Sequence, residues 1–171
     1  MLISLIGYMG SGKSHVAKIL SRKTQFHLID LDHQISVKNQ MSIPEIFKKR
    51  GEIYFRKQER EVLQELLETN KPCILSLGGG TPVYYNNMEL ITEKSESVFL
   101  RTSVKTLAER IIKQRDRRPL LARIAPPELP EFIAKHLFER NEFYSKAKFT
   151  VDTDDKEVEQ IVEEIIALLE L

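Results

Sequence analysis

Residues 7–14 read Gly-Tyr-Met-Gly-Ser-Gly-Lys-Ser, which matches the pattern Gly-x-x-x-x-Gly-Lys-Ser of a phosphate-binding loop. The apolar run at residues 2–6 predicts a strand directly before the loop, and residues 16–20 have the pattern of a helix directly after it. Glycines let successive backbone N–H groups point at phosphate oxygens, and the helix adds the positive end of its dipole. The stretch therefore predicts a nucleotide site with binding residues Gly10, Ser11, Gly12, Lys13, Ser14 and His15.

This loop is specific for a phosphate ligand but not for a reaction. A chance match in a chain of this length should occur on the order of once per hundred proteins. We expect Lys13 to reach the β- and γ-phosphates and Ser14 to bind Mg²⁺. Switch GTPases and motor-type ATPases share the loop, so any acceptor of a phosphoryl group must be identified from other residues.

Short apolar runs recur along the chain and predict the rest of the fold. Helix-patterned sequence separates these runs, which lie at 2–6, 26–29, 73–77, 97–100 and 149–151. Alternating strands and helices favour a parallel sheet covered by helices. We therefore expect an α/β fold in three layers around a five-stranded parallel sheet.

Two helices interrupt this alternation after the second strand. Ser42 followed by Pro44 and Glu45 has the pattern of a capped helix start, which would carry Ile46 and Phe47 inward. A second helix is expected at 52–69. Together they form a helical insertion, and we interpret residues 31–69 as the region that recognises an acceptor.

Length and composition indicate a single soluble domain over residues 1–171. The 26 Lys and Arg residues nearly balance the 25 Asp and Glu residues, which argues against nucleic-acid or membrane partners. Cys73 is the single cysteine, which suits a reducing compartment, and the first apolar run is too short for a signal or membrane segment. We expect a cytoplasmic monomer.

Three further groups of residues are candidates for an acceptor site, and each has an alternative explanation. Asp30 and Asp32 end the second strand, where α/β sheets bind ligands, although Asp32 could instead cap the next helix. Arg56 and Glu59 lie one helical turn apart and could form an ordinary surface ion pair. Three consecutive glycines at 78–80 suit close approach of a ligand to the backbone, or a flexible turn.

The segment around residues 112–126 is predicted to be a lid. It is rich in prolines and in cations, namely Lys113, Arg115, Arg117, Arg118 and Arg123. A solvated loop or a weak nucleic-acid patch is the alternative. No aromatic residue alternates with these cations, so closure over ATP phosphates explains the charge better than stacking on bases.

Taken in order, these motifs resemble those of the shikimate kinase family. They are the phosphate loop, Asp-x-Asp at 30–32, Phe-Arg-x-x-Glu at 55–59, Ser-Leu-Gly-Gly-Gly at 76–80, Arg-Pro-Leu-Leu at 118–121 and Arg-x-x-x-Tyr at 140–144. The likeness extends from Leu2 to about Val151. Six motifs in register make this resemblance highly specific.

The resemblance implies a P-loop enzyme that moves the γ-phosphoryl group of ATP to the 3-hydroxyl of shikimate, with Mg²⁺ as cofactor. It implies that Asp30 joins Ser14 near the metal through water, and that Arg118 is a lid arginine that acts in catalysis with Lys13 and Asp32. It assigns Arg110 and Arg118 to ATP. The implied shikimate-binding residues are Asp32, Phe47, Phe55, Arg56, Gly78, Gly79, Gly80 and Arg140.

The chain departs from the family pattern where adenine should bind. Arg110 can supply a lid-side contact, but residues 153–156 read Thr-Asp-Asp-Lys and contain neither the proline nor the arginine expected after the last strand. Two rival interpretations stay open from the sequence. One is another small kinase, acting on gluconate or a nucleoside monophosphate, and the other is a nucleotide-dependent binding module that has no acceptor.

Overall fold

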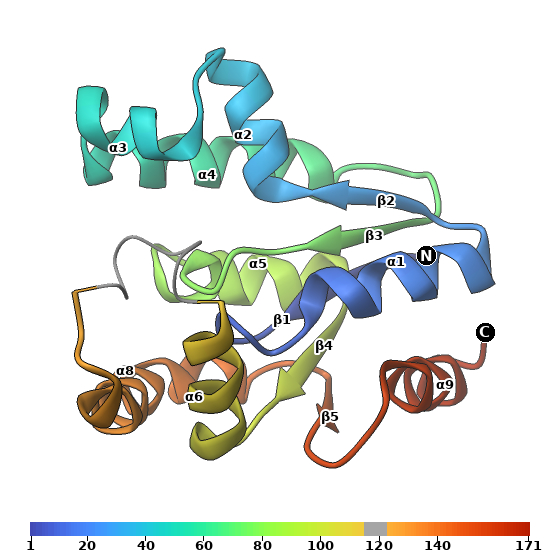
Figure 1. The fold of residues 1–171 in the computed structure, drawn as a ribbon. Coiled ribbons are helices and arrows are strands. Elements are labelled where there is room, and N and C mark those ends of the chain that lie inside the picture. The colour runs from blue at the N-terminus through green and yellow to red at the C-terminus, as the bar shows by residue number, and fades with distance from the viewer. Residues whose placement is uncertain (115–122) are drawn as a thin grey trace.

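The structure is a computed structural model that describes residues 1–114 and 123–171. The described residues form one sheet of five strands in the order β2-β3-β1-β4-β5, and every neighbouring pair is parallel (Figure 1). The strands are β1 (Leu2–Ile6), β2 (His27–Asp30), β3 (Cys73–Ser76), β4 (Glu96–Arg101) and β5 (Phe149–Asp152). The expected α/β architecture is confirmed.

Helices connect the strands. One short 3₁₀ turn follows β3, and another precedes α8. The α-helices are α1 (Lys13–Thr24), α2 (Leu31–Asn39), α3 (Ile43–Arg50), α4 (Glu52–Leu67), α5 (Asn87–Lys94), α6 (Val104–Lys113), α8 (Leu129–Tyr144) and α9 (Val158–Leu168). The 3₁₀ turns are η1 (Thr81–Val83) and η3 (Pro126–Glu128). Among the described residues, no helix has both the length and the apolar character needed to cross a membrane.

Two apolar cores, one on each face of the sheet, produce the three layers. On one face α1 and α9 pack against the strands through residues such as Leu20 and Ile165 (Figure 1). On the other face α4, α5, α6 and α8 contribute buried residues such as Leu63, Ile91 and Ile133. Because both faces are covered, the central strands are apolar almost throughout, as parallel strands usually are.

Helices α2, α3 and α4 form the predicted insertion and lie together beyond the β2 edge of the sheet (Figure 1). Ser42 and Glu45 make the expected capping box at the start of α3. Ile46 is fully buried, but Phe47 is 38% exposed, so the expectation that Phe47 points inward is wrong. The reason is that α3 turns Ile46 toward the core, and Phe47, the next residue, lies at the edge of that contact and stacks on Phe55.

The carboxyl ends of β1, β2 and β3 lie side by side, and three of the predicted motifs begin there. Ser76 pairs with Leu5 of β1 on one side and with Asp30 of β2 on the other. The phosphate loop, Asp30 and the three glycines therefore begin at neighbouring positions. Of the segment predicted to be a lid (112–126), residues 115–122 lie outside the described part of the chain, and the last residue, Pro126, begins η3.

Candidate active site

The phosphate loop has the backbone geometry that its glycines allow. Gly10 and Gly12 have φ values of +83° and +92°, in the left-handed region that favours glycine. At Gly10 an added Cβ would also come within 3.2 Å of Ile111 Cγ1 on α6. The Lys13 ammonium donates hydrogen bonds to the carbonyls of Gly7 (2.6 Å) and Tyr8 (3.0 Å), so the side chain arches back over the loop.

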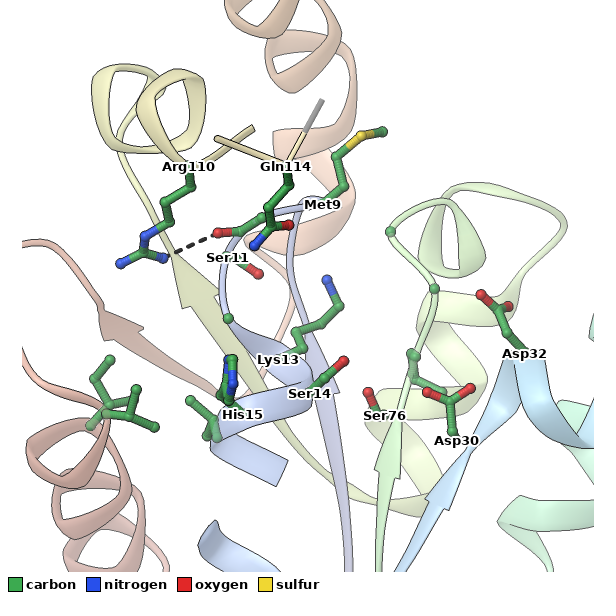
Figure 2. Close-up of a pocket in the computed structure, with 18 of the residues that line it drawn as sticks. Met9, Ser11, Lys13, Ser14, His15, Asp30, Asp32, Ser76, Arg110 and Gln114 are labelled. Carbon is green, nitrogen blue, oxygen red and sulfur yellow. Dashed lines mark hydrogen bonds between the residues drawn. The ribbon is translucent and has the colours of Figure 1, made fainter. Parts of the chain in front are cut away.

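A cavity of about 660 Å³ runs from this loop across the edge of the sheet. Figure 2 shows Lys13 and Ser14 on one side of it and Asp30, Asp32 and Ser76 on the other. Gly78 and Gly79 line the same cavity, as do Arg110, Gln114, Lys156, Glu157 and Val158. Residues predicted for the nucleotide therefore share one cavity with three of the residues predicted for the acceptor, Asp32, Gly78 and Gly79.

The two aspartates after β2 have different environments. Asp30 caps α2, because its carboxylate accepts a hydrogen bond from the His33 N–H at 3.0 Å, so the alternative in which Asp32 is the cap is wrong. Asp32 lies in the first turn of α2 and lines the cavity. Burial, helped by the nearby charges of Asp30 and Glu59, raises the pKa of Asp32 to about 6, although Arg56 and Lys13 oppose this effect.

The pair of Arg56 and Glu59 is buried, which excludes the ordinary surface ion pair. The Arg56 Nη1 donates to Glu59 Oε1 at 2.8 Å, and the two side chains are only 14% and 1% exposed. Glu59 also accepts a hydrogen bond from the Thr81 hydroxyl at 2.8 Å. The Tyr84 ring lies under the guanidinium, with its centroid 3.9 Å from Arg56 Cζ. These contacts hold the guanidinium in one orientation.

The three glycines at 78–80 let polar side chains approach the backbone. A Cβ on Gly80 would lie 2.8 Å from Arg56 Nη2, and a Cβ on Gly79 would lie 3.1 Å from Arg140 Nη1. A Cβ on Gly78 would lie 3.5 Å from Asp32 Oδ1. The turn is also hydrogen-bonded, with the Thr81 N–H donating to the Gly78 carbonyl at 3.1 Å, so it is an ordered element and not a flexible one.

Helix α8 brings Arg140 to this turn. The Tyr144 hydroxyl, one helical turn beyond Arg140, donates to the Gly79 carbonyl at 2.6 Å and fixes the helix to the glycines. Arg140 Cζ also lies 5.6 Å from the centroid of the Tyr8 ring in the phosphate loop. Asp32, Arg56 and Arg140 thus meet around three consecutive glycines.

The aromatic residues predicted to line the acceptor site stack on each other. The rings of Phe47 and Phe55 have centroids 4.6 Å apart, and Phe55 is buried while Phe47 is at the surface. The Arg56 guanidinium lies 5.0 Å from the centroid of Phe55. This packing places the aromatic pair beside the arginine.

Ser14 and Asp30 offer oxygen atoms that suit Mg²⁺. Both line the cavity, and Mg²⁺ is usually held by one or two protein oxygens together with phosphates and water. Within residues 1–114 and 123–171, no cluster of three or more His, Cys, Asp or Glu side chains could hold an ion by itself. The residues present therefore fit a metal that arrives with a phosphate ligand.

The far end of the cavity lies between α6 and the chain after β5. Arg110 donates from Nη1 to the Gly10 carbonyl at 3.1 Å, as Figure 2 shows. Lys156, Glu157 and Val158 line the opposite side, so this segment does reach the cavity without the expected proline or arginine. Arg118 lies outside the described residues.

Sequence reasoning missed several residues that support the site. Tyr84 has no signal of its own, because its contact with Arg56 depends on how η1 folds back toward α4. Gln114 and Lys156 line the cavity but belong to no motif. Tyr144 did have a signal, as the last residue of the Arg-x-x-x-Tyr motif.

Comparison with known proteins identifies relatives over the whole chain. The shikimate kinase family model matches residues 9–170. A shikimate kinase of Flavobacterium psychrophilum is 45% identical over 98% of this chain and 98% of its own length. The crystal structure of shikimate kinase from Bacteroides thetaiotaomicron superposes with a TM-score of 0.92 at 35% identity and covers 100% of this chain and 99% of its own.

A second similar structure is a complex with a ligand. Shikimate kinase from Acinetobacter baumannii in complex with shikimate superposes with a TM-score of 0.87 at 30% identity, covering 99% of this chain and 92% of that one. The phosphate loop, the glycine turn and the two half-buried arginines thus belong to a chain that is similar to shikimate kinases along nearly its whole length. The chain belongs to the shikimate kinase family.

Proposed function

We propose that this chain transfers the γ-phosphoryl group of ATP to the 3-hydroxyl of shikimate, giving shikimate 3-phosphate and ADP. The observation that carries the proposal is the meeting of Asp32, Arg56 and Arg140 at residues 78–80, at one end of the cavity that begins on the phosphate loop. A cationic pair and a carboxylate are complementary to an acceptor that has one carboxylate and several hydroxyls.

The acceptor carboxylate would bind Arg56 and Arg140. A guanidinium offers parallel donors that match the two oxygens of a carboxylate, and such charged hydrogen bonds are stronger than neutral ones. Glu59 and Tyr84 would keep Arg56 aimed at the acceptor. Phe47 and Phe55 would form an apolar wall for the ring.

The nucleotide would place its phosphates on residues 10–15 and its base near Arg110. We propose that the base lies between Arg110 and the segment 156–158, because these residues line the end of the cavity away from the glycine turn. Ser14 and Asp30 would hold Mg²⁺, Asp30 through water. The bound metal would supply positive charge to the phosphates.

Asp32 would orient the accepting hydroxyl and take up its proton late in the transfer. A pKa of about 6 leaves most of this carboxyl ionised at neutral pH, while its partial burial favours proton uptake. Lys13 would stabilise the charge that develops on the transferred group. We propose the same role for Arg118, within a lid at 112–126.

Other parts of the proposal concern the setting of the reaction. We propose that the enzyme works as a cytoplasmic monomer, without nucleic-acid or membrane partners, and that residues 1–171 act as one domain with an acceptor region at 31–69. The buried single thiol of Cys73 and the near balance of charges support this setting.

A panel of acceptors tests the proposal. ADP formation should be measured with Mg-ATP and, in turn, shikimate, gluconate and AMP at equal concentrations. We expect turnover with shikimate alone. Turnover with gluconate or AMP instead would identify a different small-molecule kinase, and ATP binding without turnover or shikimate binding would identify a binding module.

A further inference from the structure

Tyr8 lies inside the phosphate loop but makes contacts beyond it. Its side chain is 1% exposed, and its hydroxyl forms a hydrogen bond with His136 Nδ1 on α8 at 2.9 Å. The two rings meet edge to face, with centroids 5.4 Å apart and an angle of 87° between their planes. This partly buried hydrogen bond joins the phosphate loop to α8.

The main chain of Tyr8 contacts the nucleotide side of the site. Its carbonyl accepts hydrogen bonds from the Lys13 ammonium at 3.0 Å and from the Ser11 N–H at 3.1 Å. A shift of Tyr8 would therefore change the position of Lys13.

His136 belongs to α8, the helix that carries the proposed acceptor residue Arg140. It precedes Arg140 by one helical turn of α8, so both side chains lie on one face of that helix. Arg140 also lies over the Tyr8 ring, 5.6 Å from its centroid. At Gly79 an added Cβ would lie 3.1 Å from Arg140 Nη1 and 3.5 Å from the Gly7 carbonyl, so the loop, the glycine turn and α8 meet at this point.

The charge state of His136 suits this arrangement. Burial and the positive charge of Arg140 lower the pKa of His136, and Glu139 only partly opposes them. The imidazole is therefore neutral at pH 7 and places no second cation beside Arg140. It serves as a hydrogen-bonding group and not as a competing charge.

We propose that Tyr8 and His136 are positioning residues whose hydrogen bond holds α8, and with it Arg140, at a fixed distance from the phosphate loop. This inference rests on the proposed function, because Arg140 is there assigned to the acceptor carboxylate. Neither residue needs to touch a substrate. Their role is to keep Arg140, which would bind the acceptor carboxylate, at the correct distance from the phosphate that is transferred.

Kinetic variants test the pair. Tyr8→Phe and His136→Leu should each raise the KM for shikimate about three- to tenfold, the range for loss of one hydrogen bond, with a smaller fall in kcat. The double variant should be no worse than either single variant, because both remove the same bond. His136→Asn, which keeps a polar group near the position of Nδ1, should restore most of the affinity.

A matched control separates this effect from the general loss of a buried hydroxyl. Ser95→Ala removes a buried hydroxyl that forms a hydrogen bond with the Ser4 hydroxyl at 2.8 Å and joins the end of α5 to β1, at a residue assigned to neither substrate. It should leave the KM for shikimate unchanged. An unchanged KM in Tyr8→Phe and His136→Leu, or effects that multiply in the double variant, would overturn the inference.

Amide hydrogen exchange on the ligand-free protein tests the pair without any acceptor. Tyr8→Phe should speed exchange in residues 136–144, and His136→Leu should speed exchange in residues 10–14, in each case on the element that was not altered. Effects confined to the altered element would overturn the inference. If the unaltered protein shows no turnover with shikimate, the proposed function fails, and this exchange measurement alone then decides about the pair.

Discussion

Arg56 combines two properties that a surface arginine does not have. It is held by a carboxylate, Glu59, that is itself almost fully buried, and it lies over an aromatic ring contributed by the next segment of chain. Burying such a pair is not an efficient way to stabilise a fold, since desolvation offsets much of the attraction. The arrangement is better explained by the need to hold a guanidinium ready for an anion.

Arg56→Ala and Arg140→Ala should each weaken acceptor binding by at least about 1.5 kcal/mol, because each removes charged hydrogen bonds to the carboxylate. Arg56→Ala should also lower the free energy of unfolding by roughly 3 kcal/mol, since Glu59 would stay buried without its partner. Isothermal calorimetry with shikimate and chemical denaturation measure the two effects.

The variant Arg56→Ala/Glu59→Gln is the matched control for this prediction. It should regain much of the lost stability, because no buried charge is left unpaired, but it should not regain acceptor affinity. Unchanged acceptor affinity in both single variants would refute the assignment of the carboxylate to these arginines.

Asp32 should give the activity a characteristic pH dependence. Its pKa of about 6 in the free protein means that the ionised form is lost as the pH falls through that value. A hydroxyl-orienting base must be ionised, so kcat/KM for shikimate should decline below about pH 6. Asp32→Asn should abolish this dependence together with most of the activity. A profile with no transition near pH 6 would contradict the role of Asp32.

The same carboxyl should affect stability in the opposite sense to an ion-paired aspartate. A raised pKa means that the folded protein binds a proton that the unfolded chain releases between about pH 4 and pH 6. Ionised Asp32 therefore destabilises the ligand-free fold above that range. Asp32→Asn should be more stable than the unaltered protein by roughly 2 kcal/mol at pH 8, and the difference should vanish toward pH 4.

Asp152 is the control for this measurement. The hydrogen bonds from Arg101 lower the pKa of Asp152, so Asp152→Asn should bring no gain in stability at pH 8. Thermal or denaturant unfolding at a series of pH values compares the two. If Asp32→Asn and the unaltered protein were equally stable at pH 8, the ionised Asp32 carboxylate would not destabilise the fold.

At the scale of elements, the glycine turn at 78–80 is the part of the site that the fold positions most directly. It follows β3, whose last residue Ser76 pairs with both β1 and β2, so the turn emerges beside the phosphate loop. The glycines are needed for space and not for unusual backbone angles, because none of the three has a positive φ. Their function can be tested by adding single methyl groups.

Gly80→Ala should raise the KM for shikimate by about tenfold and lower the free energy of unfolding by up to the roughly 3 kcal/mol expected for Arg56→Ala. The added Cβ would lie 2.8 Å from Arg56 Nη2, so the guanidinium would have to move away from the turn and from Glu59. Steady-state kinetics with a thermal melt checks both parts. A variant with unchanged KM would show that Arg56 does not need its position over the turn.

Gly51→Ala should affect stability without affecting the acceptor site. No atom of the described residues lies within 4 Å of a Cβ there, but φ is +85°, which a residue with a side chain adopts only with strain. It should lower stability by about 1–3 kcal/mol and leave the KM for shikimate nearly unchanged. Gly80→Ala tests the loss of space beside Arg56, and Gly51→Ala tests backbone strain alone.

Features set by neighbouring residues could be predicted from the sequence. The strand and helix around residues 7–14 and the capping box at Ser42 follow from short-range patterns, and all are present. The helix start after β2 could not be resolved, because Asp30 and Asp32 are both suitable caps and the choice depends on where the strand ends. The structure selects Asp30.

Features that depend on distant segments could not be predicted. The burial of Arg56 and Glu59 requires Thr81 and Tyr84, and these approach α4 only because η1 folds against it. The exposure of Phe47 depends on how α3 packs on α4, where its ring contacts Phe55 from the surface. The connection between Tyr8 and His136 spans 128 positions and has no local pattern.

At the scale of the whole molecule, one cavity joins two substrate sites that have different residues. Saturating shikimate and saturating Mg-ADP should each stabilise the protein, by about 2.7 kcal/mol at one hundred times the dissociation constant, which raises Tm by about 5–10 °C for a chain of this size. Arg140→Ala should lose at least about half of the response to shikimate and keep that to Mg-ADP. Lys13→Ala should do the reverse.

Loss of both responses in each variant would show that the substitutions damage the fold and not one site. Equal responses in the variants and the unaltered protein would contradict the division of the cavity into an acceptor end and a phosphate end. Differential scanning fluorimetry over a series of ligand concentrations provides the comparison.

The most direct test of the central claim is the identity of the product. Shikimate and Mg-ATP should be incubated with the protein, and the product should be examined by proton–phosphorus correlation NMR. We predict one new phosphate monoester whose phosphorus couples to the proton on carbon 3 of shikimate, in amounts equal to the ADP released. No phosphorylated shikimate, or a phosphate on another hydroxyl, would contradict the proposed function.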